Sequence, residues 1–162
     1  MSPAVVVLLL FAGVSETAGR ILPLVARRPG MSRVFVAGLL PAAGLVEGAV
    51  FALWPLTAWT LAELVPSSPP PGSGLTWTPG LVAPLVLAGV LAFPLLGPLL
   101  HLLLFVGVGA GLADPLASAT GLGWWSAAGC LAVAGVGLGV AVEAVRRLVV
   151  RISAIEERES IA

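Results

Sequence analysis

Residues 26–56 read "ARRPGMSRVFVAGLLPAAGLVEGAVFALWPL", a basic turn followed by a long apolar run that contains one acid, Glu47. Apolar residues occupy most positions on both sides of Glu47, and the nearest basic residue is Arg33. The run is longer than the about 20 residues that a helix needs to cross a bilayer. The stretch therefore predicts a spanning helix, and it raises the question of why a carboxylate lies inside it.

The composition of the whole chain is that of a membrane protein. Of its 162 residues, 59% are hydrophobic and 10% are charged, whereas a soluble domain has about 25% charged residues. Backbone groups in lipid must be satisfied internally, which favours helices. We therefore predict a single all-α domain over residues 1–162, an integral membrane bundle in contact with the lipid bilayer. Its predicted spanning helices are residues 3–26, 34–63, 81–113 and 122–145, the last with a helical extension to about residue 160.

Several classes of function are disfavoured by the sequence. The net charge is zero, so no nucleic acid partner is expected. The chain has one His and one Cys, too few for a common zinc site, and it has no phosphate-binding loop or nucleophile motif. We therefore expect no metal, no cofactor, no catalytic residues and no enzymatic activity of its own. All basic residues are Arg, and with abundant Ala, Gly and Pro this suggests a GC-rich genome and a bacterial plasma membrane.

The orientation depends on two groups of basic residues. They lie around the first turn and near the C-terminus, at Arg20, Arg27, Arg28, Arg33, Arg146, Arg147, Arg151 and Arg158. With four crossings the two groups face opposite sides, so the rule that places basic residues in the cytoplasm does not decide. The uncharged, proline-rich loop 66–80 favours a cytoplasmic first turn with both termini outside. In the alternative, Pro94 and Pro98 break segment 81–113 into a re-entrant element, and both Arg groups lie inside.

Three predicted helices carry glycines one turn apart, at Gly44/Gly48, Gly107/Gly111 and Gly135/Gly139. Small residues at this spacing let helix backbones approach closely in lipid. They predict packing within the chain or, alternatively, an interface with a second copy or with another subunit. Segment 122–145 is the strongest candidate for such an interface.

Three ionisable residues lie deep inside predicted helices. By residue count, Glu47, Glu16 and His101 lie about 21, 16 and 18 Å from the ends of their segments at 1.5 Å per residue, near the middle of a core about 30 Å thick. Ionisable groups at this depth are costly and need a reason. If the three helices face one another, the side chains form a cluster that could pass a proton or hold a cation.

Each of these groups also has a structural interpretation. Arg20 follows Glu16 by four residues, so the two could form an intrahelical ion pair. His101 could bond a backbone carbonyl that Pro98 leaves free. Glu143 lies beside Arg146 and Arg147 at a membrane edge and is expected to be structural. Glu47 has no Arg within a turn of its own helix and is the least explained charge.

The stretch around Glu47 resembles the proton-carrying proteolipid subunits (subunit c) of rotary ATPases, over residues 20–54. Those subunits are helical hairpins with an Arg–polar–Pro turn and a carboxylate 18 residues after the Pro. Here "ARRP" ends at Pro29, and Glu47 follows 18 residues later within "GLVEGAVF". The resemblance implies that Glu47 carries a proton and that Arg27 and Pro29 shape a cytoplasmic turn.

Two functions follow from these observations. The first is proton or cation transport, with Glu47 as carrier and Glu16 and His101 nearby, in one chain or in a homo-oligomeric ring. The second is a non-catalytic accessory or scaffold subunit of a larger membrane complex. In that role the glycine faces and the C-terminal helix would dock on a partner.

Overall fold

The computed structural model describes residues 1–27, 32–65, 75–92 and 98–159. They form five helices and, over these ranges, no strand. The helices are α1 (Pro3–Ala26), α2 (Arg33–Glu63), α3 (Pro79–Ala92), α4 (Pro98–Thr120) and α5 (Trp124–Glu159). The predicted all-α membrane bundle is confirmed: α1, α2, α4 and α5 are each long and apolar enough to span a membrane.

The first two helices match the prediction closely. The N-terminus of α1 is capped by the Ser2 hydroxyl, which accepts a hydrogen bond from the Val5 N–H, and Pro3 follows in the first turn, where its missing donor costs nothing. Helix α2 continues through Pro41 and Pro55. The predicted C-terminal extension is also confirmed, because α5 runs as one 36-residue helix.

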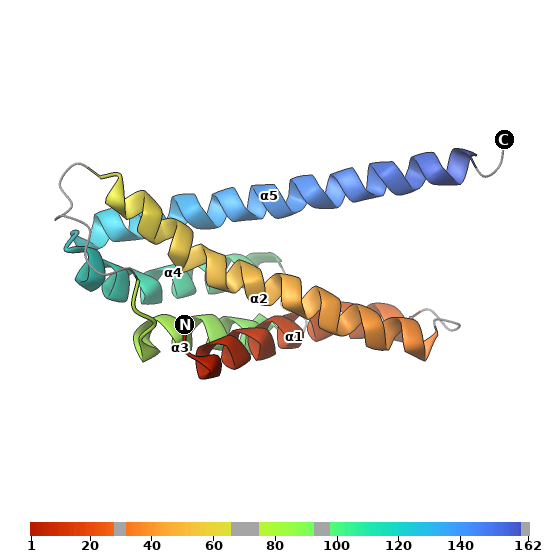
Figure 1. The fold of residues 1–162 in the computed structure, drawn as a ribbon, viewed down its shortest axis with the longest axis horizontal. Coiled ribbons are helices and arrows are strands. Elements are labelled where there is room, and N and C mark those ends of the chain that lie inside the picture. Colours follow the sequence, from red (N-terminus) through yellow and green to blue (C-terminus); the bar gives the residue numbers. More distant parts are fainter. Residues whose placement is uncertain (28–31, 66–74, 93–97, 160–162) are drawn as a thin grey trace.

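The prediction for the third segment, 81–113, is wrong. In place of one helix there are two, α3 and α4, which run in opposite directions and pack on each other (Figure 1). Helix α3 has 14 residues and is about 21 Å long, shorter than the hydrocarbon core. Pro98 begins α4, at the first helical position, where proline is favoured. Helix α4 also extends beyond the predicted end of that segment at residue 113, because it continues through Pro115 to Thr120 and ends before Gly121, whose φ is 70°.

This reversal decides where the basic residues lie. The end of α1, the start of α2 and the end of α5 all lie at one end of the bundle, on the right of Figure 1. The start of α1 lies toward the opposite end. The predicted placement of the two Arg groups on opposite sides, with both termini outside, is therefore wrong, because α3 and α4 add a reversal. In the described helices the two groups instead lie at the same end of the bundle, as they would in the alternative arrangement. Arg28 and residues 66–74 of the predicted exported loop lie outside the described ranges.

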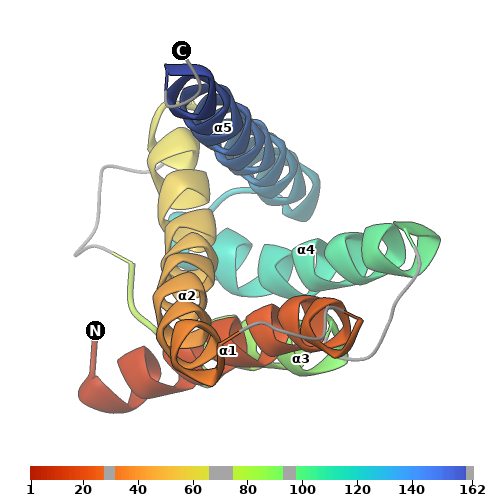
Figure 2. The same cartoon turned by 90° about the vertical axis from the view of Figure 1, so that its right-hand side faces the viewer.

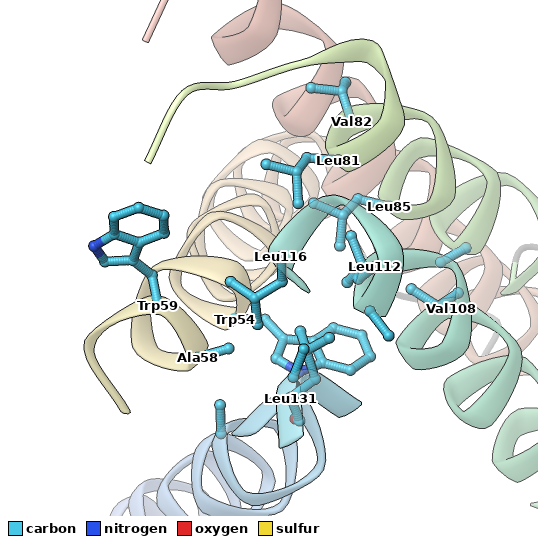
Figure 3. Packing of buried hydrophobic residues seen from close by; sticks show 14 of the residues in the cluster. Trp54, Ala58, Trp59, Leu81, Val82, Leu85, Val108, Leu112, Leu116 and Leu131 are labelled. Carbon is cyan, nitrogen blue, oxygen red and sulfur yellow. Dashed lines mark hydrogen bonds between the residues drawn. The ribbon is translucent and has the colours of Figure 1, made fainter. Parts of the chain in front are cut away.

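The core lies where α2, α3, α4 and α5 meet (Figure 3). Its fully buried large side chains come from all four helices: Pro55, Leu81, Leu85, Leu112, Leu116 and Leu131. Large apolar side chains on the outer faces are exposed, among them Val7, Phe11, Leu102 and Val140. This distribution suits a bundle whose surface is covered by lipid tails. Helix α1 lies across α2 and α3, and α5 stands beside α2 and α4 (Figure 2).

Candidate functional site

The first component of the candidate site is an ion pair on α1. Glu16 lies within the spanning part of α1, with a side chain that is only 10% exposed. The guanidinium of Arg20, one turn further along, donates a hydrogen bond to the Glu16 carboxylate. The predicted intrahelical pair is therefore confirmed.

The second component is Glu47 on α2. The Arg20 Nη1 atom lies 2.9 Å from the Glu47 Oε1 atom and donates a hydrogen bond to it. Glu47 therefore does have a positive neighbour, which comes from α1 and not from its own helix. The contact could not be predicted from sequence spacing, because the two residues are 27 positions apart and lie on different helices. One guanidinium thus bridges two carboxylates from adjacent helices, and we call these three residues the acid–arginine cluster.

Close packing of α1 on α2 makes the bridge possible. A Cβ atom added at Gly13 would lie 2.2 Å from the Gly44 carbonyl oxygen and 2.4 Å from the Gly48 nitrogen. Backbones can come this near only where side chains are missing. Gly44 and Gly48 therefore pack within the chain, as one of the two predicted alternatives stated. Gly13 is their partner on α1, and it has no second glycine one turn away that would have marked it in the sequence.

The other two glycine pairs are each half used inside the bundle. A Cβ at Gly111 would lie 3.3 Å from Pro84 of α3, and one at Gly135 would lie 2.5 Å from the Phe105 ring. By contrast, a Cβ at Gly107 or at Gly139 would meet no atom within 4 Å. Gly111 and Gly135 thus contribute to packing within the chain, whereas Gly107 and Gly139 make no such contact.

Two cavities adjoin the acid–arginine cluster. The first, of about 220 Å³, lies between α1, α2, α3 and α4 and includes His101 in its lining. The second, of about 270 Å³, lies between α1, α2, α4 and α5 and includes Glu47. We call them the α3–α4 cavity and the α2–α5 cavity. They share five lining residues, Glu16, Arg20, Phe51, Trp54 and Phe105.

His101 occupies a different place along its helix than expected. It is the fourth residue of α4, because the chain reverses before Pro98. It nevertheless lines the α3–α4 cavity together with Glu16 and Arg20. The three predicted ionisable residues are thus brought to one region, with Arg20 between the two acids.

Three aromatic rings form the apolar side of this region. The rings of Trp54 and Phe105 are stacked, with centroids 4.8 Å apart and planes within 3° of each other. The Trp54 Nε1–H donates a hydrogen bond to the Leu131 carbonyl, at 2.8 Å, so the indole is fixed between α2, α4 and α5 (Figure 3). These aromatic residues were not predicted as part of the site. The sequence does hold a pattern that indicates two of them, because Phe51 and Trp54 follow Glu47 by four and seven residues and share its helix face.

A second ionic group lies at the end of the α5 span. Glu143 accepts hydrogen bonds from Arg146 and Arg147, both at 2.7 Å. These side chains are exposed or half-exposed, so the expected structural pairing at the edge is confirmed. Among the described residues, no three His, Cys, Asp or Glu side chains gather as a metal site would require.

The charges of the acid–arginine cluster do not balance. Two carboxylates and one guanidinium leave one negative charge when both acids are ionised. Among the described residues, the other titratable side chain that lines these two cavities is His101. A cluster of this kind can take up one proton or one cation.

Comparison of the chain with protein-family models, with curated proteins and with solved structures found no match. The resemblance to proteolipid hairpins therefore stays a prediction, and the function must be argued from the site itself.

Proposed function

We propose that this multi-pass membrane protein takes up one proton or small cation at the acid–arginine cluster and moves it across the bilayer. The observation that supports the proposal is that two carboxylates share one guanidinium inside spanning helices. An uncompensated charge at the centre of a spanning helix costs about 2.5–3.5 kcal/mol on insertion scales. The excess negative charge therefore favours the uptake of one positive charge.

The two acids have different roles in this proposal. Glu16 is the more buried, with a side chain 10% exposed against 22% for Glu47. Glu16 holds Arg20 on α1 through the intrahelical pair, and Glu47, the more exposed acid, is the proposed carrier. The Arg20 side chain is 55% exposed, which leaves it room to shift toward whichever carboxylate is charged.

The test is proton flux in vesicles that contain the purified protein. Glu47→Gln removes the excess charge and the carrier, so we expect flux to fall to the level of empty vesicles while the protein stays folded. Glu63→Gln is the matched control, because Glu63 lies on the same helix and is exposed, bonded to the Trp59 indole N–H at 2.8 Å. Flux that survives Glu47→Gln, or a parent protein no more permeable than empty vesicles, would contradict the proposal.

A second candidate function is that of an accessory subunit, which assembles either with further copies of this chain or with other proteins in a larger complex. The observation that favours it is the outer face of α5, where a Cβ at Gly129 or Gly137 would meet no atom within 4 Å and neither glycine lines a cavity described above. Small residues on an outward face allow a second helix to approach closely. In that case Gly129→Leu lowers the mass of the native assembly, and Glu47→Gln leaves it unchanged. A parent chain that runs as a monomer in native mass measurements excludes the homo-oligomer.

A further inference from the structure

The α2–α5 cavity is larger and more apolar than a site for a proton alone needs to be. Its polar end is formed by Glu16, Arg20 and Glu47, and its remaining lining is apolar or aromatic. Helices α2 and α5 lie close at one end and diverge toward the Arg-rich end, which both views show (Figures 1 and 2). The cavity therefore lies between two helices that separate toward one face of the membrane.

We propose that this cavity binds an organic cation with an apolar or aromatic body. The cationic head takes the place of the proton beside Glu47, and the body lies against Phe51, Trp54 and Phe105. The inference rests on the proposed function, because the same excess negative charge attracts both the proton and the cation.

Charge and lining together select this class of ligand. An anion would meet two carboxylates against one guanidinium, so a cation is favoured. A small metal cation prefers a shell of several oxygen ligands, whereas the walls away from the cluster are hydrocarbon, including Val50, Leu138 and Val142. Aromatic faces attract organic cations when water is excluded.

The size of the cavity fits a small molecule. Its volume of about 270 Å³ is close to the lower end of the range for ligand pockets, about 300 Å³. Gly135 lets the Phe105 ring lie against α5, since a Cβ there would be 2.5 Å from that ring. Gly139, one turn further along, lines the cavity and has open space at its Cβ position. Gly135 thus makes room for the Phe105 ring, and Gly139 leaves space in the cavity that a larger residue would fill.

The test uses benzyltrimethylammonium as the probe, with the full chain in detergent. Calorimetry measures binding, and a pH electrode in weakly buffered solution measures the proton that the cation displaces. We expect binding with proton release, and neither heat nor release with neopentylbenzene, the neutral isostere in which carbon replaces nitrogen. Glu47→Gln should abolish the proton release, and Glu63→Gln should preserve it.

Two further variants locate the probe in the α2–α5 cavity. Gly139→Leu fills the cavity and should weaken binding by about tenfold or more. Gly137→Leu is its matched control, because Gly137 has equally open space but lines neither cavity. Phe51→Leu keeps an apolar wall but removes an aromatic face, which should weaken binding about three- to thirtyfold.

The outcomes separate this inference from the proposed function. Proton flux in vesicles without probe binding would overturn the inference and leave the proposed function standing. Binding that the neutral isostere matches, or that Gly139→Leu and Glu47→Gln do not change, would also overturn it. Probe binding with proton release but without flux would support the cation site and refute transport.

Discussion

Replacement of Gly13 by Ala tests the contact between helices on which the acid–arginine cluster depends. The added Cβ would lie 2.2 Å from the Gly44 carbonyl oxygen, whereas ordinary contact begins at 3.4 Å. The difference requires α1 and α2 to separate by about 1.2 Å at this point, because the atoms that the Cβ would meet, the Gly44 oxygen and the Gly48 nitrogen, belong to the backbone of α2. Arg20 lies seven residues further along α1, about two turns away and on the same face.

The cost of the substitution follows from this geometry. Overfilling a packed contact costs about 1–3 kcal/mol. If the separation extends to Arg20, its 2.9 Å contact with Glu47 lengthens to about 4 Å, beyond hydrogen-bond range. Loss of a pair this exposed adds about 1 kcal/mol or less, and the better helix propensity of Ala offsets about 1 kcal/mol. We expect a net loss of about 1–3 kcal/mol in the free energy of unfolding.

The assay is equilibrium unfolding in mixed micelles, with Gly38→Ala as the matched control. Gly38 lies in the same hairpin, on α2, and a Cβ there would meet nothing within 4 Å. That variant should be as stable as the parent or slightly more stable. If Gly13→Ala is as stable as Gly38→Ala, α1 and α2 do not approach as closely as described, and the shared guanidinium is refuted with that contact.

Three further predictions follow from the fold and the core. Because both Arg groups lie at one end, reporter fusions should place the N-terminus outside and the C-terminus in the cytoplasm; reporters on the same side would refute this. Trp54→Phe removes the hydrogen bond to the Leu131 carbonyl and should cost about 0.5–1.5 kcal/mol in unfolding, whereas Trp125→Phe, at an 83% exposed residue, should cost nothing measurable; equal effects would refute the role of the bond. Gly89→Ala places a Cβ 2.6 Å from the Ala12 carbonyl oxygen and should lower the free energy of unfolding by about 1–3 kcal/mol; an unchanged stability would contradict the contact between α1 and α3.

Much of the fold could be predicted from the sequence because length and hydropathy determine which segments span a bilayer. Helices α1, α2 and α5 were predicted in this way. The third segment was not, because an apolar run that contains Pro94 and Pro98 can continue with a kink or turn back. Apolarity is the same in both cases, and the choice depends on the packing of α3 against α1 and α4.

The candidate site was predicted only in part, for a different physical reason. Residue counts along each helix brought Glu16, Glu47 and His101 to a similar depth, and the structure places them around adjoining cavities. Counting gives depth but no rotation about the helix axis, so it could not show that Arg20 reaches across to Glu47. Gly13 lies two turns before Arg20 on the same face of α1, so it indicates the rotation of that helix once Gly44 and Gly48 are known to face it.

The most direct test of the central claim is infrared detection of a protonated carboxyl group in the purified protein at neutral pH, without added metal cations. Two acids that share one guanidinium predict one protonated carboxyl in the parent. They predict none in Glu16→Gln or Glu47→Gln, where Arg20 balances the remaining acid. Absence of the signal from the parent, or a signal that persists unchanged in both variants, would contradict the claim that this cluster holds an exchangeable charge.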